Sequence, residues 1–384
     1  FTIIYIINTY IMNEFNSDIR VDKLTNQKCC LFNYAILNIK TKQNITLFVP
    51  SKQFDNELPD KISCNSSNDN LIQLNRVESW AEKIEEVPVK KGVWVLISDY
   101  VNSNAGHVLG DEVYAIWQSL CVFGLQEHDF NIITNNHFIH KQLYQCLTKK
   151  KIYSFEEFKN KDVSFEHLIV GMARNGYALA HNNPINKKKA PKNASNVSIR
   201  SLDNRASYLP PFNETFEAFR NHCYKIFDID ETSHLFQNHK RTILFLDKCE
   251  KVSDHTCKLY EIDKIIKLVQ EKHLNYNVKK INWNGMNIGD QVKEMAMTDI
   301  VISLPGSDLM NCIFLNPKGH IICPDRFYYN EDKQGSNEIA IWFQFTHNCI
   351  EISDTLLVKT DNQLYSKVNE DFLLKHIDNI VSTM

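Results

Sequence analysis

The sequence predicts an α/β protein with two Rossmann-like lobes that face a central cleft. From Lys91 onward, strand-like apolar runs alternate with helix-like segments, which is typical of a parallel sheet. A long polar stretch, residues 182–211, interrupts this alternation, which then starts again. The chain has 384 residues, whereas a single hydrophobic core stops growing at about 250–300 residues. We therefore expect an N-terminal lobe over residues 1–235 and a C-terminal lobe over residues 236–384.

The N-terminal lobe is expected to begin with β structure. Residues 34–40 and 45–49 resemble strands, and the Asn- and Ser-rich stretch 63–70 resembles a loop. The alternating part that follows predicts strands at 92–100, 129–134 and 165–170 and helices at 111–123, 140–148 and 213–227. The polar stretch 182–211 between the last two elements is a loop of a length that is uncommon without a function.

The C-terminal lobe repeats the same alternation. It predicts strands at 242–246, 278–283, 301–302 and 320–323 and helices at 260–272, 288–297, from 309 onward and at 370–381. The short, continuously apolar strands indicate a sheet that is covered on both faces.

A turn of small residues follows the strand that ends at Ile302. Pro305-Gly306 closes this strand, and Ser307 or Asp308 is expected to cap a helix that begins at Leu309. Such a turn presents backbone N–H groups and the positive end of a helix at the carboxyl edge of a sheet, where an anionic phosphate is stabilised. It therefore predicts nucleotide or sugar-phosphate binding, with an ordinary strand-turn-helix connection as the alternative.

A second segment, residues 106–117, combines an imidazole with a carboxylate. His107 and Asp111 are four residues apart, so they share a face if the helix begins early. A carboxylate beside an imidazole is a suitable acid/base pair, because neighbouring groups can tune either pKa toward neutrality. The alternative is that Asp111 caps a helix beginning at Glu112 while His107 bonds a nearby loop.

Composition excludes some classes of partner. The net charge of −3, from 43 basic and 46 acidic residues, provides no electrostatic footprint for nucleic acid. The 11 cysteines have no zinc-ligand spacing, so we predict no metal site from them, and they do not settle the redox compartment.

The N-terminal residues Phe1 to Met12 are apolar but too few to span a bilayer, which takes about 20 residues. Two readings stay open. The segment is either the end of a truncated signal-anchor, which implies a membrane and the Golgi or ER lumen, or it precedes a true start at Met12, which implies a cytoplasmic protein.

The two segments together resemble glycosyltransferase family 61, whose enzymes have a two-lobed GT-B fold. The resemblance spans roughly residues 92–324 and is strong only in the two segments. The matching residues are His107, Asp111, Gln291 (with Asp290 where the family often has Glu), Thr298, Asp299, Gly306, Leu309, Asn311 and Phe314. Lys248 stands where the family tends to carry an arginine.

The resemblance implies an inverting transferase that moves a sugar from a nucleotide diphosphate, a UDP-sugar, to a hydroxyl of a glycan or glycoprotein. Asp111 is the expected general base, and His107 orients it or binds substrate. The expected donor-binding residues come from the C-terminal lobe: Lys248, Gln291, Gly306, Ser307, Asp308, Leu309 and Asn311. Because a helix end and a cation can hold a diphosphate, no metal or other cofactor is required.

One departure from the family pattern creates an alternative. Pro305 stands where the family has a histidine before the turn glycine. The loss of that histidine permits a catalytically silent binding protein of the same fold, since fold alone does not imply activity. A third reading is another two-lobed nucleotide-sugar enzyme, such as an epimerase, which needs no acceptor.

Overall fold

The computed structural model describes residues 18–21, 28–41, 43–50, 60–63, 71–98, 105–135, 140–171, 212–230, 239–247, 258–304, 306–324, 348–352, 355–360 and 363–384. The chain divides into two compact units. The first contains residues 1–103, 107–178 and 200–212, and the second contains residues 104–106, 179–199 and 213–384.

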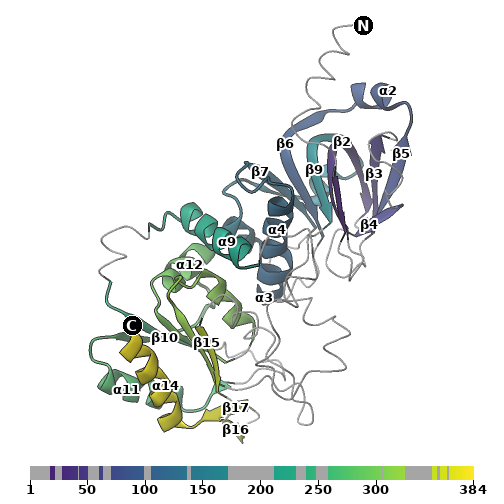
Figure 1. Cartoon of the computed structure of the whole chain (residues 1–384). Coiled ribbons are helices and arrows are strands. Elements are labelled where there is room, and N and C mark those ends of the chain that lie inside the picture. Colours follow the sequence, from purple (N-terminus) through teal and green to yellow (C-terminus); the bar gives the residue numbers. More distant parts are fainter. Residues whose placement is uncertain are drawn as a thin grey trace. The chain divides into compact units, whose positions relative to one another are not determined.

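The first unit is built on a nine-stranded mixed sheet (Figure 1). Its strand order is β4 (Lys61–Ser63), β5 (Leu71–Val77), β3 (Asn44–Pro50), β2 (Lys28–Thr41), β9 (Asp162–Gly171), β6 (Val89–Ile97), β7 (Phe130–Thr134) and β8 (Ile152–Ser154), with β1 (Asp18–Val21) paired to β2. Strands β9, β6, β7 and β8 are parallel, whereas β2 runs antiparallel to both β3 and β9. The β-rich start therefore extends the same sheet as the Rossmann-like part.

The helices of the first unit differ from the prediction in two places. The helix predicted at 111–123 begins earlier: α3 (Ala105–His107) continues through a π-helical turn, η1 (Val108–Val113), into α4 (Tyr114–Val122). The helix predicted at 140–148 is a 3-10 helix, η2 (Lys141–Cys146). Two short helices complete the unit, α2 (Trp80–Glu85) and α5 (Phe155–Phe158).

The second unit contains a five-stranded sheet that is parallel throughout. Its order is β12 (Asn277–Ile281), β10 (Thr242–Leu246), β13 (Ile300–Ile302), β14 (His320–Pro324) and β15 (Asn348–Ile352). Numbered along the chain this is 2-1-3-4-5, the order of a doubly wound sheet. A small three-stranded sheet of β11 (Lys258–Leu259), β17 (Gln363–Val368) and β16 (Thr355–Thr360) lies beside it.

Helices cover both faces of the five-stranded sheet (Figure 1). The apolar stripes of α11 (Ile262–Lys272) and α14 (Glu370–Thr383) pack on the face that presents Ile243, Phe245 and Ile302. Figure 1 shows α12 (Ile288–Ala296) and α9 (Phe212–Ile226) on the other side. Strands β10, β13 and β14 are buried on both faces, which explains why their sequences are almost continuously apolar, whereas the edge strand β12 is partly exposed and carries two lysines.

Helix α9 packs within the second unit, whereas the predicted boundary at residue 235 placed it in the first. Its Tyr224 hydroxyl donates a hydrogen bond to the carbonyl oxygen of Phe314 at 2.7 Å. The rings of Phe219 and Phe314 lie 6.3 Å apart between centroids. The predicted α/β class is confirmed, and the mutual arrangement of the lobes stays a prediction.

Candidate functional site

The second unit has a topological switch point between β10 and β13. From β10 the chain crosses to β12 on one side, and from β12 it crosses back to β13 on the other. The connections that follow β10 and β13 therefore diverge to opposite faces of the sheet. In open parallel sheets, ligands bind at this divergence, at the carboxyl ends of the strands. Phe245 and Ile302 are paired in register, so the two strands end at the same level.

The turn after β13 lies at this switch point. Gly306 has φ 145° and ψ −175°, a conformation that only glycine adopts without strain. The following helix, η4 (Ser307–Phe314), is a 3-10 helix with Gly306 at its N-cap and no side-chain cap. The predicted cap by Ser307 or Asp308 is therefore wrong: the turn is closed through the backbone, because the Leu309 N–H donates to the Gly306 carbonyl at 3.0 Å.

The predicted donor-binding residues of this turn separate into two groups. Gly306, Ser307 and Asp308 are half-buried, whereas Leu309 is fully buried and Asn311 is 7% exposed. The N–H of Leu309 is already engaged within the turn. The structure thus brings the first three to the carboxyl edge of the sheet and places the other two inside the unit.

Gln291 lies on α12, and its side chain is directed to the loop between β12 and α12. It is 6% exposed, and its amide Nε2 donates to the carbonyl oxygen of Met286 at 2.8 Å. The Asn287 side chain caps the same helix by accepting from the Asp290 N–H at 2.9 Å. Gln291 therefore fixes loop 282–287 at the carboxyl edge of the sheet.

The end of β10 carries charged groups. The backbone N–H of Asp247 donates to Ile281 at 2.8 Å, and its carboxylate lies 3.8 Å from Lys280 Nζ. Lys280 is bound more closely by Asp263, at 2.6 Å. Lys248, the predicted phosphate-binding cation, and Pro305 lie outside the described residues.

His107 and Asp111 lie on one continuous helical segment. His107 ends α3 and Asp111 lies within the π-helical turn η1, and the side chains of both are outside what the structure describes. Because this segment begins at Ala105, Asp111 is inside the helix and does not cap a helix starting at Glu112. The early start required for His107 and Asp111 to share a face is therefore present. Single π-helical turns within α-helices occur frequently at functional sites.

The backbone at Gly106 approaches the turn after β13. A Cβ atom on Gly106 would lie 2.9 Å from the Cα of Ser307 and 3.2 Å from Cγ of Met310. The contacts of Gly106 assign it to the second unit, whereas the next residue, His107, is assigned to the first. The glycine of the first sequence segment thus packs directly against the turn of the second.

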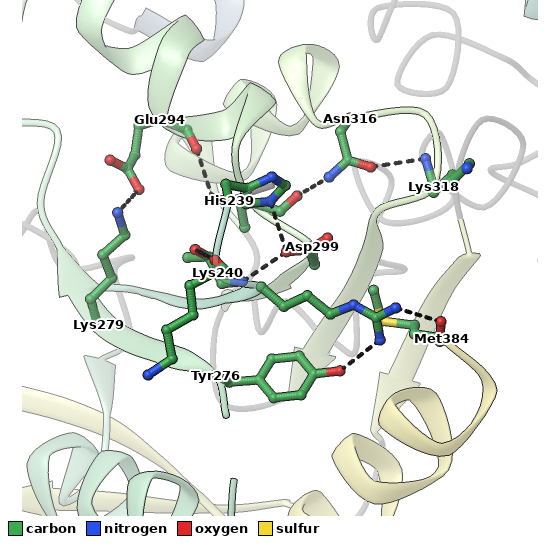
Figure 2. Close-up of polar contacts among 12 residues, drawn as sticks. His239, Lys240, Tyr276, Lys279, Glu294, Asp299, Asn316, Lys318 and Met384 are labelled. Atoms are coloured by element: carbon green, nitrogen blue, oxygen red, sulfur yellow. Dashed lines mark hydrogen bonds and ion pairs between the residues drawn. The ribbon is translucent and has the colours of Figure 1, made fainter. Parts of the chain in front are cut away.

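Asp299 immediately precedes β13, so it lies at the amino edge of the sheet, whereas the turn follows the other end of that strand. Figure 2 shows its polar contacts. Its carboxylate accepts from the Thr242 N–H at 2.7 Å and lies 3.3 Å from His239 Nε2. Its own N–H donates to the Thr242 carbonyl at 3.0 Å. The neighbouring Thr298 donates through its hydroxyl to the Glu294 carbonyl at 2.7 Å, and its own carbonyl accepts from Asn316. This part of the family motif fastens β10 to β13 and does not contact the switch point.

Two further residues, Glu112 and Trp283, were not singled out in the sequence analysis. Glu112 is fully buried and accepts a hydrogen bond from the Tyr144 hydroxyl, although its position next to Asp111 reads as a helix surface. Trp283 follows β12 in loop 282–287, whereas the sequence predicts it within the strand at 278–283. The asparagines on both sides of Trp283 were the available signal that the strand ends before it.

The described residues hold no group of three or more His, Cys, Asp or Glu side chains that could bind a metal ion. In the same part of the chain, no helix is both long enough and apolar enough to span a membrane.

A solved structure, the glycosyl transferase family 9 protein from Veillonella parvula DSM 2008, aligns with 78% of this chain and 99% of its own at 10% identity. The TM-score of this alignment is 0.30. None of the curated proteins matches significantly. The family model of Glycosyltransferase 61 matches residues 135–322, a range that contains the switch point, the turn and Gln291. This match covers just under half of the chain, and it supports a glycosyltransferase of the family 61 type.

Proposed function

We propose that the protein is an inverting glycosyltransferase that moves a sugar from a UDP-sugar to a hydroxyl of a glycan or glycoprotein. The observation that carries the donor assignment is the position of the Gly306 turn at the switch point of a doubly wound parallel sheet. Backbone N–H groups at such a turn favour a diphosphate. Ser307 and Asp308 follow Gly306, and in the sequence Lys248 comes shortly after the end of the neighbouring strand β10.

Inversion takes place in one in-line displacement. The Asp111 carboxylate accepts the proton of the acceptor hydroxyl while the oxygen of that hydroxyl forms a bond to the anomeric carbon of the donor sugar. The bond from that carbon to the diphosphate breaks, and its electron pair leaves with UDP. His107, four residues earlier on the same helical segment, orients the base or the acceptor. The turn and Lys248 stabilise the charge that develops on the departing UDP, and this step needs no metal.

The test is acceptor-stimulated release of nucleotide diphosphate from a panel of UDP- and GDP-sugars. Wild type and Asp111→Asn are compared, with Asp129→Asn as the matched control because that carboxylate is highly exposed in the same unit. We expect release from a UDP-sugar that falls at least 100-fold in Asp111→Asn while UDP affinity is unchanged. Equal release by wild type and Asp111→Asn would exclude Asp111 as the base.

A second candidate is a silent glycosyltransferase-like binding protein. The observation that favours it is Pro305, which replaces the family histidine and has no side-chain donor. In that case the folded wild type binds UDP but releases none from any donor, with or without acceptor. Pro305→His would then be expected to create measurable release. An epimerase would instead convert the donor without any acceptor.

A further inference from the structure

Trp283 carries an unsatisfied polar group at the carboxyl edge of the five-stranded sheet. The residue is 9% exposed, and its indole Nε1 is buried without a hydrogen-bond partner among the described residues. An indole N–H is a donor only, and leaving one buried and unpaired destabilises the folded protein. Trp94, in the first unit, shows the usual arrangement, because its Nε1 donates to the Lys91 carbonyl at 3.0 Å. A persistent unpaired donor therefore calls for an explanation.

The position of Trp283 relative to the switch point provides an explanation for its unpaired N–H. Ile281 of β12 pairs with Leu246 of β10, and Phe245 of β10 pairs with Ile302 of β13, so all three strands end at one level. Trp283 lies two residues beyond the end of β12, and Gly306 lies four residues beyond the end of β13. Two strand spacings separate β12 from β13, about 10 Å. A nucleoside diphosphate extended from its terminal phosphate to its base covers a distance of this order.

The loop that carries Trp283 is held in place from several sides. The Met286 N–H donates to the Trp283 carbonyl at 3.1 Å, and the Gln291 side chain binds the Met286 carbonyl at 2.8 Å. Within the same loop, the Asn284 N–H donates to the Asn282 side chain at 2.8 Å. These bonds fix the backbone on both sides of Trp283.

We infer that Trp283 recognises the nucleobase of the donor, with its indole N–H donating to a carbonyl oxygen of the base. The inference rests on the proposed function, because it assumes a nucleoside diphosphate at the switch point. Uracil presents two carbonyl oxygens and adenine presents none, so Trp283 favours UDP over ADP. The phosphates are bound separately by the turn after β13.

The test uses the full chain and three probes: UDP, uridine and inorganic pyrophosphate. Trp283→Phe keeps an aromatic ring and removes the N–H, and Trp94→Phe is the matched control in the other unit. We expect Kd for UDP and for uridine to rise roughly 3- to 10-fold in Trp283→Phe, the loss of one neutral hydrogen bond. Kd for pyrophosphate is expected to stay unchanged, and Trp94→Phe to bind all three probes as the wild type does.

The outcomes separate this inference from the proposed function. If the wild type and a folded Trp283→Phe variant bind UDP with the same affinity, Trp283 does not recognise the base. The proposed donor site itself is then still supported. Wild type that binds neither UDP nor pyrophosphate overturns both. If Trp283→Phe does not fold, indole ¹⁵N NMR of the wild type decides: the Trp283 resonance shifts with UDP if the inference holds and stays fixed if it fails.

Discussion

Gly106 packs against Ser307 so closely that a Cβ atom would lie 2.9 Å from the Ser307 Cα. Because the obstacle is backbone, it cannot rotate away, and Gly106→Ala must displace the turn after β13. We expect a loss of about 1–3 kcal/mol in the free energy of unfolding, the usual cost of overpacking, together with weaker UDP binding. Chemical denaturation and calorimetric titration with UDP measure the two effects.

Gly319→Ala is the control for that experiment. Its Cβ would lie 2.5 Å from Cγ of Leu315, so it also overpacks the second unit, but beside the start of β14 at the opposite edge of the sheet. It should destabilise the protein without changing the Kd for UDP. Unchanged UDP affinity in Gly106→Ala would show that the turn does not contribute to donor binding.

Asp299 is expected to matter for stability and not for donor binding. Asp299→Ala leaves the buried Thr242 N–H without its side-chain acceptor and should lower the free energy of unfolding by about 2–3 kcal/mol. Asp299→Asn retains an acceptor oxygen and should cost less, about 1 kcal/mol. Urea unfolding and UDP titration of both variants check this. Weakened UDP binding in a stable Asp299→Asn variant would contradict the structural role.

The Tyr144–Glu112 hydrogen bond is expected to stabilise the π-helical turn that carries Asp111. Tyr144→Phe removes the phenol that donates to this buried carboxylate, which should cost about 1.5–3 kcal/mol. Since the turn positions Asp111, kcat should fall while the Kd for UDP is kept. Ser119→Ala, a buried hydroxyl on α4 that donates to Ala115 at 2.8 Å, is the control. It should lower stability and leave kcat unchanged.

Much of the fold followed from apolar periodicity, because strands β10, β13 and β14 are buried on both faces and read as continuous apolar runs. The sequence leaves the start of the helix before Asp111 open, because Asn104 before Ala105 and Asp111 before Glu112 are both residue types that cap helices. Strands β4 and β5 were missed for a different reason. The edge strand β4 has only three residues, and its neighbour β5 is half polar, so neither reads as a strand from apolar pattern alone.

The site was predictable in part. The Gly306 turn follows a buried strand, and this local pattern is readable from sequence. The positions of Gln291, Asp299 and Trp283 depend on which edge of the sheet each residue reaches, and Asp299 also depends on a partner 57 residues away in sequence, Thr242. Asp299 and Gly306 are seven residues apart, yet β13 places them at opposite edges. No local pattern shows that difference.

The stability of the second unit should fall as the pH falls below about 6.5. Burial lowers the pKa of His273 against the opposing pull of Asp378, and burial likewise lowers the pKa of His320 against Asp299. In the unfolded chain both histidines bind a proton near pH 6.5, whereas in the folded unit they do so only at lower pH. At pH values between the lowered pKa of the folded unit and 6.5, the unfolded state binds more protons than the folded state does. The free energy of unfolding therefore declines as the pH falls through this range. Urea unfolding at pH 7.5, 6.5 and 5.5 measures the decline, and His273→Gln should make it shallower. An equal or steeper decline in His273→Gln would show that His273 is already protonated in the folded unit, where it lies 3.2 Å from the carboxylate of Asp378.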